Sequence, residues 1–378
     1  MAETFPRWGF PEVNFVEVDP EVIKTEIITG FEKASGQALA VGDPRRLFLL
    51  SIAERIIHLQ NCINITGQQN LLTYAVGGNA DALGVLLSTE RLDASSALTT
   101  LEFSLTQAQN KDYVIPAGFE VTNGIVTFAT DDELLIPAGE ITGQISATCT
   151  STGIAGNDYL PGQITTIVKP KPYLDKAKNI TTTSGGADIE SDEQYAERLR
   201  LATDSFSVAG PPAAYEFHAR SVTPAIIDVS VFSPNPCEVE IYPLVTGGKI
   251  PTKDVLDKVT EYFSRDDIIP LTDKVNVLAP EAVDYEVNVD YYITRDDLKK
   301  SETIQSAIEN AVNEYILWQQ AEVGRPISPD NLIYQVKAAG AFNVDLTTLS
   351  PSSFVELTHG QIAQCRKVTI TYKGAILT

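Results

Sequence analysis

The chain has 378 residues and carries 50 acidic and 28 basic side chains, so its formal charge is −22. Apolar residues make up 43% of it and charged residues 21%, a composition typical of folded proteins. Nucleic acids and anionic membranes both attract clustered Lys and Arg, so this acidity argues against a nucleic-acid partner and against docking on a membrane. The length predicts several domains, each with enough chain for a hydrophobic core.

The sequence shows no sign of membrane insertion or secretion. Its most apolar stretch, Leu47–Ile57, is too short to span a bilayer and contains Glu54 and Arg55. Residues 1–10 lack a basic region followed by an apolar core, so no signal peptide is expected. The cysteine spacing fits neither a zinc site nor a disulfide framework. It predicts isolated buried thiols in a reducing cytoplasm, at Cys62, Cys149, Cys237 and Cys365.

The N-terminal quarter is predicted to be helical after an extended start. Residues 1–42 are expected to form an acidic arm and a short helix, and Asp43 followed by Pro44 predicts the start of a second helical segment, 43–94. This segment is typical of one long helix or two stacked ones, broken at Gly77 and followed by a short helix. Its apolar residues occupy more than one helix face, so it needs more than one neighbour.

Charge is uneven within this quarter. Residues 1–32 hold two basic and seven acidic side chains, whereas residues 33–98 hold five of each. In a strongly acidic protein, a neutral and leucine-rich stretch can approach another subunit without like-charge repulsion. The helical segment is therefore a candidate contact surface.

Residues 95–180 are predicted to form an all-β, hairpin-rich unit. Thr, Val, Ile and Gly dominate, turns recur at short intervals, and no Lys or Arg occurs from Asp112 to Val168. The tetrapeptide Ile-Pro-Ala-Gly appears at 115–118 and again at 136–139, each time before a short run typical of a strand. The repeat is too short to indicate a solenoid.

The rest of the chain is predicted to form two small α+β layers, 181–280 and 281–378, with mainly antiparallel sheets. Ser191 and Gln194 fit a capping box at the start of a helix. From 283 to 293, apolar residues occupy every second position with polar residues between them, the pattern of a strand with one face in water. The predicted fold class is multidomain α+β, with N-terminal helices, an all-β unit and two α+β layers.

No group of residues points to catalysis, a metal or a cofactor. His58, His218 and His359 are far apart in sequence, and no nucleophile elbow, dinucleotide fingerprint or phosphate-binding lysine motif is found. Structural roles are the preferred interpretation of all three histidines.

The acidic run at 188–193 has two interpretations. Carboxylates at alternate positions are typical of a calcium loop, but Glu193 stands where such a loop needs Gly, and no Glu closes it twelve residues after the first ligand. Acids in the first turn of a helix are favoured by the helix dipole. Helix capping is therefore preferred over metal binding.

The same region resembles the signature of baseplate J-like proteins, which are wedge components of contractile phage tails, R-type bacteriocins and related contractile injection systems. The matching residues include Gly185, Gly186, Asp188, Glu190, Ser191, Asp192 and Arg198. Other segments are also similar to the family and occur in the same order along the chain as in the family. They are both Ile-Pro-Ala-Gly segments, Gly153-Ile-Ala-Gly156 and Gly210-Pro-Pro-Ala-Ala-Tyr215. The resemblance runs from about residue 43 to the C-terminal end of the sequence.

The resemblance implies a structural protein without enzymatic activity or cofactors, made in the bacterial cytoplasm and built into the baseplate. Such a wedge joins the ring around the tail hub and helps to transmit the contraction trigger to the sheath. The implied partners are a second copy and a second wedge protein in a 2:1 complex, a sheath-initiator protein, and neighbouring wedges. The helical segment becomes a core-bundle element, with its subunit interface expected at Leu47, Leu50, Ala53, Ile57, Leu71 and Leu72.

The residues from Gly185 to Arg198, which we call the glycine-acid motif, are expected to form an architectural junction, with Arg198 paired to an acidic neighbour. Two other functions stay open. A secreted β-rich adhesin or binding module is suggested by the Thr-rich, Lys-poor residues 99–168, although the expected absence of a signal peptide argues against it. An enzyme is supported only by scattered carboxylates.

Overall fold

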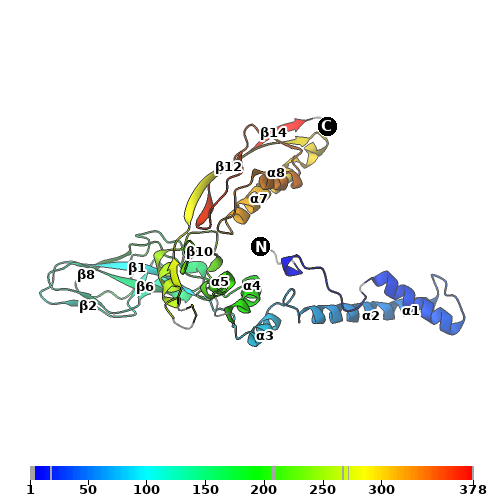
Figure 1. Cartoon of the computed structure of the whole chain (residues 1–378), viewed down its shortest axis with the longest axis horizontal. Helices are drawn as coiled ribbons and strands as arrows, with labels where there is room; N and C mark the ends of the chain where they lie inside the picture. Colours follow the sequence, from blue (N-terminus) through cyan, green and yellow to red (C-terminus); the bar gives the residue numbers. More distant parts are fainter. Residues whose placement is uncertain (1–4, 18, 207–209, 266–267, 271, 377–378) are drawn as a thin grey trace. The chain divides into compact units, whose positions relative to one another are not determined.

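The computed structural model describes residues 5–17, 19–206, 210–265, 268–270 and 272–376 (Figure 1). Contacts divide the chain into two compact units. The smaller unit comprises the residues up to Arg91 together with Ser191–Arg200, and the larger comprises Leu92–Glu190 and the residues from Leu201 onward. Within the described ranges, no helix has both the length and the apolar character needed to cross a membrane.

The smaller unit is built around a helical hairpin. Helices α1 (Pro20–Ser35) and α2 (Pro44–Gln68) lie beside one another (Figure 1). Each begins after an aspartate, Asp19 or Asp43, whose carboxylate accepts a hydrogen bond from a main-chain N–H two residues later, and each has a proline in its first turn. The predicted helical segment therefore starts as expected, and α2 is one continuous helix.

Two shorter helices complete this unit. Helix α3 (Gly78–Leu86) follows the turn after α2, and the first part of α4 (Asp192–Ala202) returns from later in the sequence. Ala80 of α3 and Tyr195 and Leu199 of α4 form one small core with Ala75, which precedes α3. A short 3-10 turn, η1 (Arg7–Gly9), lies in the N-terminal arm.

The larger unit begins with an antiparallel sheet in the order β7-β3-β4-β6-β1-β8 and a separate antiparallel pair of strands, β2 and β5. Strand β1 alternates between buried and half-buried residues along its length, so one face builds the core around Leu101, Phe103 and Phe128. The predicted hairpin-rich β unit is confirmed. Its strands are β1 (Ser96–Leu105), β2 (Tyr113–Ile115), β3 (Glu120–Thr122), β4 (Thr127–Thr130), β5 (Leu134–Ile136), β6 (Thr142–Thr152), β7 (Thr166–Ile167) and β8 (Leu174–Asn179).

A first α+β layer follows. Its three-stranded sheet has the order β11-β10-β9, and its core joins Tyr215, Ile241, Val259 and Phe263. The elements are η3 (Asp204–Phe206), α5 (Pro212–Arg220), β9 (Ile226–Phe232), β10 (Glu238–Val245), α6 (Lys253–Tyr262) and β11 (Lys274–Val277).

The second α+β layer has the sheet order β13-β12-β14. Its core combines the inward residues of β12 with Ile308, Val312 and Tyr315 of α7 and Leu332 of α8. The elements are β12 (Glu281–Thr294), η4 (Asp296–Lys300), α7 (Ser301–Gln319), α8 (Pro329–Ala338), β13 (Asn343–Val344) and β14 (Gln361–Ile376).

The α+β class is confirmed, but the pairing in both small sheets is mixed. Strand β10 pairs antiparallel with β9 and parallel with β11, and β12 pairs antiparallel with β13 and parallel with β14. The expectation of mainly antiparallel sheets therefore needs correction for these two layers. Each parallel neighbour is reached through a connection that contains helices, as parallel pairing requires.

Two smaller expectations are also corrected. The polar residues between 283 and 293 are expected on the water-facing side of β12, but one of them, Asp290, is only 5% exposed, and Lys373 and Thr348 bond its carboxylate. The four cysteines are free, and Cys149 is buried, but Cys62 and Cys237 are exposed. The prediction of buried thiols is wrong at these two positions, because Cys62 lies on an exposed face of α2 and Cys237 lies in the turn before β10.

Candidate interaction surfaces

One face of α2 carries a regular apolar stripe that the described residues leave open. The side chains follow one another at spacings of three, four, three and four residues, the repeat that aligns a helix for packing against another helix. In this stripe Ile52 is 38%, Leu59 59% and Ile63 51% exposed. Leu49 and Ile56 are half-buried. We call this stripe the α2 seam: Leu49, Ile52, Ile56, Leu59 and Ile63.

The six residues predicted for the interface do not form one surface. Leu47 is 59% exposed, but Ala53 is buried, and Leu50 and Ile57 are half-buried on the helix face that Ala53 shares. Leu71 and Leu72 lie in the turn beyond the end of α2, where Leu72 packs against the small core of α3 and α4.

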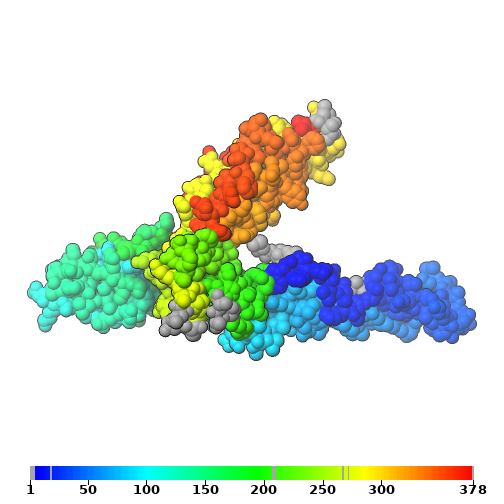
Figure 2. Space-filling model, in the orientation of Figure 1, coloured from blue at the N-terminus to red at the C-terminus, as the bar shows by residue number. Residues whose placement is uncertain are grey.

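The N-terminal arm covers the face of α2 that carries Asn64 and Gln68. Asn64 is 4% exposed, and its side-chain oxygen accepts hydrogen bonds from the main-chain N–H groups of Phe15 at 2.7 Å and Val16 at 3.0 Å. Gln68 donates to the carbonyl of Val13 at 2.8 Å. Figure 2 shows the dark-blue arm lying over the lighter-blue surface of α2. This coverage separates a closed face of α2 from the open α2 seam.

The start of the arm is held by a buried arginine. Arg7 is 2% exposed, donates to the carbonyls of Leu72 and Ala75 at 2.9 Å each, and pairs with Glu193 of α4 at 2.9 Å. Trp8 donates through Nε1 to Glu197 at 2.8 Å. The sequence analysis missed this anchor, although a single arginine within an acidic arm was a visible signal.

Charge is absent from the second half of the α2 seam. No Asp, Glu, Lys or Arg occurs from Ile56 to Ala80, and the polar residues there are Asn, Gln, Thr, Tyr, His and Cys. A like-charged second copy could therefore approach this half of the helix without direct charge repulsion.

The first half of the glycine-acid motif, residues 185–190, is hydrogen-bonded to the β unit. Gly186 exchanges two hydrogen bonds with the side chain of Asn157, at 2.7 and 2.9 Å. A Cβ on Gly186 would lie 2.4 Å from the carbonyl oxygen of Gly153, so only glycine fits there, and Gly185 has a φ of +85°. Asp188 accepts from the N–H of Ile154 at 3.2 Å.

Glu190 is the last residue of this half of the motif. It is 3% exposed, its carboxylate accepts from the main-chain N–H of Leu92 at 2.9 Å, and its own N–H donates to the carbonyl of Leu92 at 3.0 Å. The carboxylate thus acts as a main-chain partner, as buried acids usually must.

The second half of the motif belongs to the smaller unit. Ser191 Oγ accepts from the N–H of Gln194 at 3.3 Å and the Gln194 side chain accepts from the N–H of Ser191 at 3.3 Å, so the predicted capping box is present. Asp192 accepts from the N–H of Gly77 at 2.9 Å and pairs with Arg91 at 2.7 Å. Arg198, 3% exposed, donates to the carbonyl of Glu90. Within the described residues, no group of three or more His, Cys, Asp or Glu could hold a metal ion.

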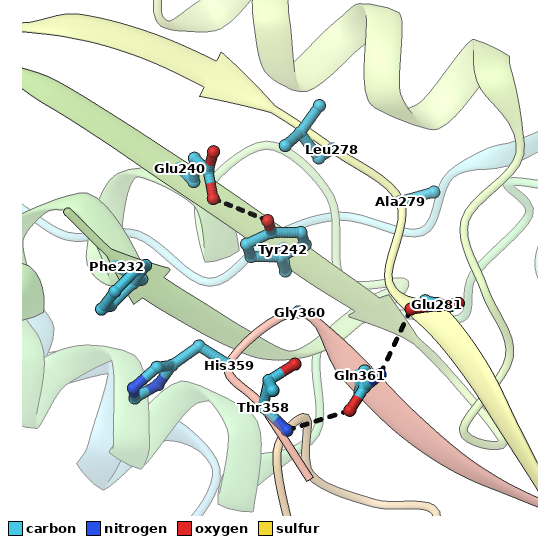
Figure 3. A pocket seen from close by; sticks show the side chains of 10 residues that line it. All are labelled: Phe232, Glu240, Tyr242, Leu278, Ala279, Glu281, Thr358, His359, Gly360 and Gln361. Carbon is cyan, nitrogen blue, oxygen red and sulfur yellow. Dashed lines mark hydrogen bonds between the residues drawn. The ribbon is translucent and has the colours of Figure 1, made fainter. Parts of the chain in front are cut away.

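The two α+β layers meet at a crevice of about 600 Å³ (Figure 3). His359 stacks on Phe232 with ring centroids 4.6 Å apart, and the Tyr242 ring packs so closely on Gly360 that a Cβ there would lie 2.8 Å from it. Burial and a 2.7 Å hydrogen bond to Glu240 raise the pKa of Tyr242 to about 12, so it stays a neutral donor. His359 thus has an aromatic packing role in this crevice.

A half-buried carboxylate also joins these layers. Asp228 in β9 accepts from Arg220 of α5 at 3.1 Å and from the main-chain N–H of Val323, beyond α7, at 2.9 Å. Val323 packs in a cluster with Leu244 and Ile362. Burial raises the pKa of Asp228 above its ordinary value, against the opposing effect of these hydrogen bonds.

Comparisons with known proteins give consistent matches along the chain. Three family models match consecutive stretches: the Baseplate J-like protein barrel domain at residues 100–186, the Baseplate J-like central domain at 207–279, and the Baseplate J-like protein C-terminal domain at 287–371. Baseplate protein J of Escherichia phage P2 is 29% identical over 190 residues, which are 50% of this chain and 61% of that protein. The match thus spans less than two thirds of that relative's length.

Among solved structures, a chain of the anti-feeding prophage (AFP) baseplate, from a 6-fold symmetrised cryo-EM structure, aligns with 96% of this chain and 95% of its own length. The sequence identity is 13% and the TM-score 0.39, which is too low to establish a common fold.

Proposed function

The chain belongs to the baseplate J-like family, and we propose that it is a structural, non-enzymatic subunit of the baseplate of a contractile tail. The family match over the β unit and both α+β layers supports this role more than that of an adhesin. The chemistry of the described residues is consistent with it, because Glu190, Asp192 and Arg198 make structural contacts.

In this proposal the subunit is a wedge component of the ring around the tail hub. Its partners are a second copy and a second wedge protein in a 2:1 complex, a sheath-initiator protein, and neighbouring wedges, and it helps to pass the contraction trigger to the sheath. It is made in the bacterial cytoplasm and functions in the assembled particle.

The single observation that carries the assembly proposal is the open α2 seam. Burying one Leu or Ile side chain stabilises an interface by about 1.5–3 kcal/mol, so five such residues in a three-four repeat can hold a helical bundle. The glycine-acid motif is proposed to be architectural, with one half bonded to the β unit and the other to the helical unit.

Paired charge substitutions test the seam. Leu59→Asp with Ile63→Asp places two carboxylates within it, where a partner helix would leave them buried and unpaired. The variant should lose co-purification with the second wedge protein and with a second, differently tagged copy.

Leu47→Asp with Ile65→Asp is the matched control. These residues are 59% and 58% exposed, as open as Leu59 and Ile63, but they lie on another face of the same helix. The control should retain the complex. If it loses the complex while the seam variant keeps it, the interface lies on the Leu47 face and the seam assignment is wrong.

A further inference from the structure

The basic side chains of the β unit are gathered at one groove. Residues 112–168 contain no Lys or Arg, so the positive charge of this unit lies at Lys111 before that stretch and at 169–178 after it. The fold brings the two segments together at a surface groove of about 540 Å³, which both Lys111 and Lys171 line. We call it the β2 groove; residues 109–114 and 171–173 form it.

The lysines at the β2 groove have no acidic partner among the described residues. Lys171 is half-buried, and its ammonium group donates to the carbonyl of Val114 at 3.2 Å. Lys111 and Lys169 are exposed, and no described carboxylate lies within ion-pair distance of any of these three lysines. Lys178 on β8, in contrast, already forms a 2.9 Å ion pair within the β unit. In a chain of charge −22, positive charge is therefore left available at this groove.

The acidic residue that lines the groove is used by its own loop. Asp112 Oδ1 accepts a hydrogen bond from the main-chain N–H of Ala138 at 2.9 Å. The N–H of Gly139 donates to the carbonyl of Gln109 at 3.0 Å. Both donors belong to the second Ile-Pro-Ala-Gly segment, so this repeated motif fixes the loop that carries Lys111. This part of the groove is thus formed before any partner binds.

The other segment of the groove carries an exposed aromatic ring. Tyr173 is 51% exposed and has a φ of +67°, a conformation that is unusual for a bulky residue. Its carbonyl accepts from the main-chain N–H of Thr106 at 2.9 Å, and Tyr113 Oη donates to the carbonyl of Pro172 at 2.7 Å. Backbone strain that is maintained by surrounding contacts is concentrated at binding sites. The groove therefore combines lysines with a fixed apolar surface.

We propose that the β2 groove binds an acidic segment of a different baseplate subunit, with an apolar residue between its carboxylates. The lysines attract the carboxylates, and the ring of Tyr173 packs against the apolar residue. A second copy fits less well, because residues 10–21, which have this composition, are bonded to their own α2 through Asn64. The inference rests on the proposed role as an assembling subunit but uses a surface distinct from the α2 seam.

Photocrosslinking in the producing cell tests the occupant. The full chain carries Tyr173→p-benzoylphenylalanine, and mass spectrometry identifies the peptide that is crosslinked to it in assembled particles. A net acidic peptide from another subunit of the particle is the expected result. A crosslink to a second copy of this chain, to nucleic acid or to a neutral or basic peptide would overturn the proposal, and so would the absence of any crosslink.

Charge reversal tests the lysines. Lys111→Glu with Lys171→Glu should lower the yield of this crosslink about tenfold, because like charges across an interface repel. Replacing the acidic residues of the crosslinked peptide with Lys should restore the yield. Because Lys171 is half-buried, Lys111→Glu alone is a second variant, which should also lower the yield.

Lys299→Glu with Lys300→Glu is the matched control. Both lysines are exposed in η4, and the pair changes the net charge by the same amount as Lys111→Glu with Lys171→Glu. The control should keep the yield of the crosslink. An unchanged yield in both groove variants, or an equal loss in the control, would overturn the proposal.

The same particles separate this inference from the proposed function. Particles that assemble normally but give no crosslink at position 173 would refute the β2 groove alone, and the baseplate role would stand. Complete tails in a strain that lacks the gene would refute the baseplate role itself.

Discussion

The ring of Phe15 lies directly against Gly67, and a Cβ at Gly67 would be 2.6 Å from its Cδ2 atom. This contact sets the arm on α2 next to the hydrogen bonds of Asn64 with Phe15 and Val16. The arm is therefore part of the helical unit, and it determines which face of α2 is closed and which is open for a partner.

Gly67→Ala should loosen the arm. The added methyl group must displace Phe15, and such overpacking costs about 1–3 kcal/mol. Hydrogen exchange of the Phe15 and Val16 amides should become about tenfold faster, which corresponds to ~1.4 kcal/mol. Gly30→Ala is the control, because Gly30 lies in α1 with open space around its Cβ position. It should leave exchange of the arm unchanged, and equal exchange in both variants would refute the contact.

Gly84→Ala should destabilise the core of the helical unit. Its Cβ would lie 1.8 Å from Tyr195 Oη, which donates to the carbonyl of Thr89 at 2.7 Å. Losing a buried hydrogen bond of this kind costs about 1–3 kcal/mol. Trp8 fluorescence in a Trp318→Phe background should report a lower denaturation midpoint for this unit. Gly78→Ala, with no atom near its Cβ position, should not lower it.

The contribution of Asp228 to the stability of the junction between the α+β layers should decrease as pH rises. Its pKa is raised in the folded state by burial, so the folded chain binds this proton more readily than the unfolded chain. Stability from this group is therefore greatest at acidic pH and falls as pH rises from the unfolded pKa through the raised folded pKa.

Two substitutions isolate this effect. Asp228→Asn keeps an acceptor for the Val323 N–H and removes the charge, so it should be tolerated and should lose the pH dependence. Asp228→Ala leaves that N–H unpaired and should cost about 1–3 kcal/mol. Exchange protection of the Val323 amide, corrected for its intrinsic rate at each pH, measures both. Protection in the unmodified chain that rises with pH relative to Asp228→Asn would contradict this account.

Local signals predicted much of the fold. The Asp43-Pro44 start of α2 and the Ser191–Gln194 capping box depend on residues within one helical turn, and both are present. The alternation of β12 likewise follows from neighbours in sequence, and five of its inward residues are buried. The proposed boundaries of the five segments stay predictions.

Long-range partners could not be predicted from these patterns. The parallel pairing of β12 with β14 joins strands separated by two helices, and no local residue encodes that direction. Similarly, both apolar faces of α2 were visible in sequence, but the arm that covers one of them is held by Arg7 through contacts with residues 65 to 186 positions away. This is why the predicted interface mixed Ala53 and Leu50 with exposed Leu47.

Deletion of the gene in the producing cell, followed by negative-stain electron microscopy of released particles, tests the central claim most directly. Contractile tails with baseplates should be absent, and they should return with the unmodified gene and with Leu47→Asp/Ile65→Asp, but not with Leu59→Asp/Ile63→Asp. Complete contractile tails with normal baseplates in the deletion strain would contradict a baseplate role for this chain.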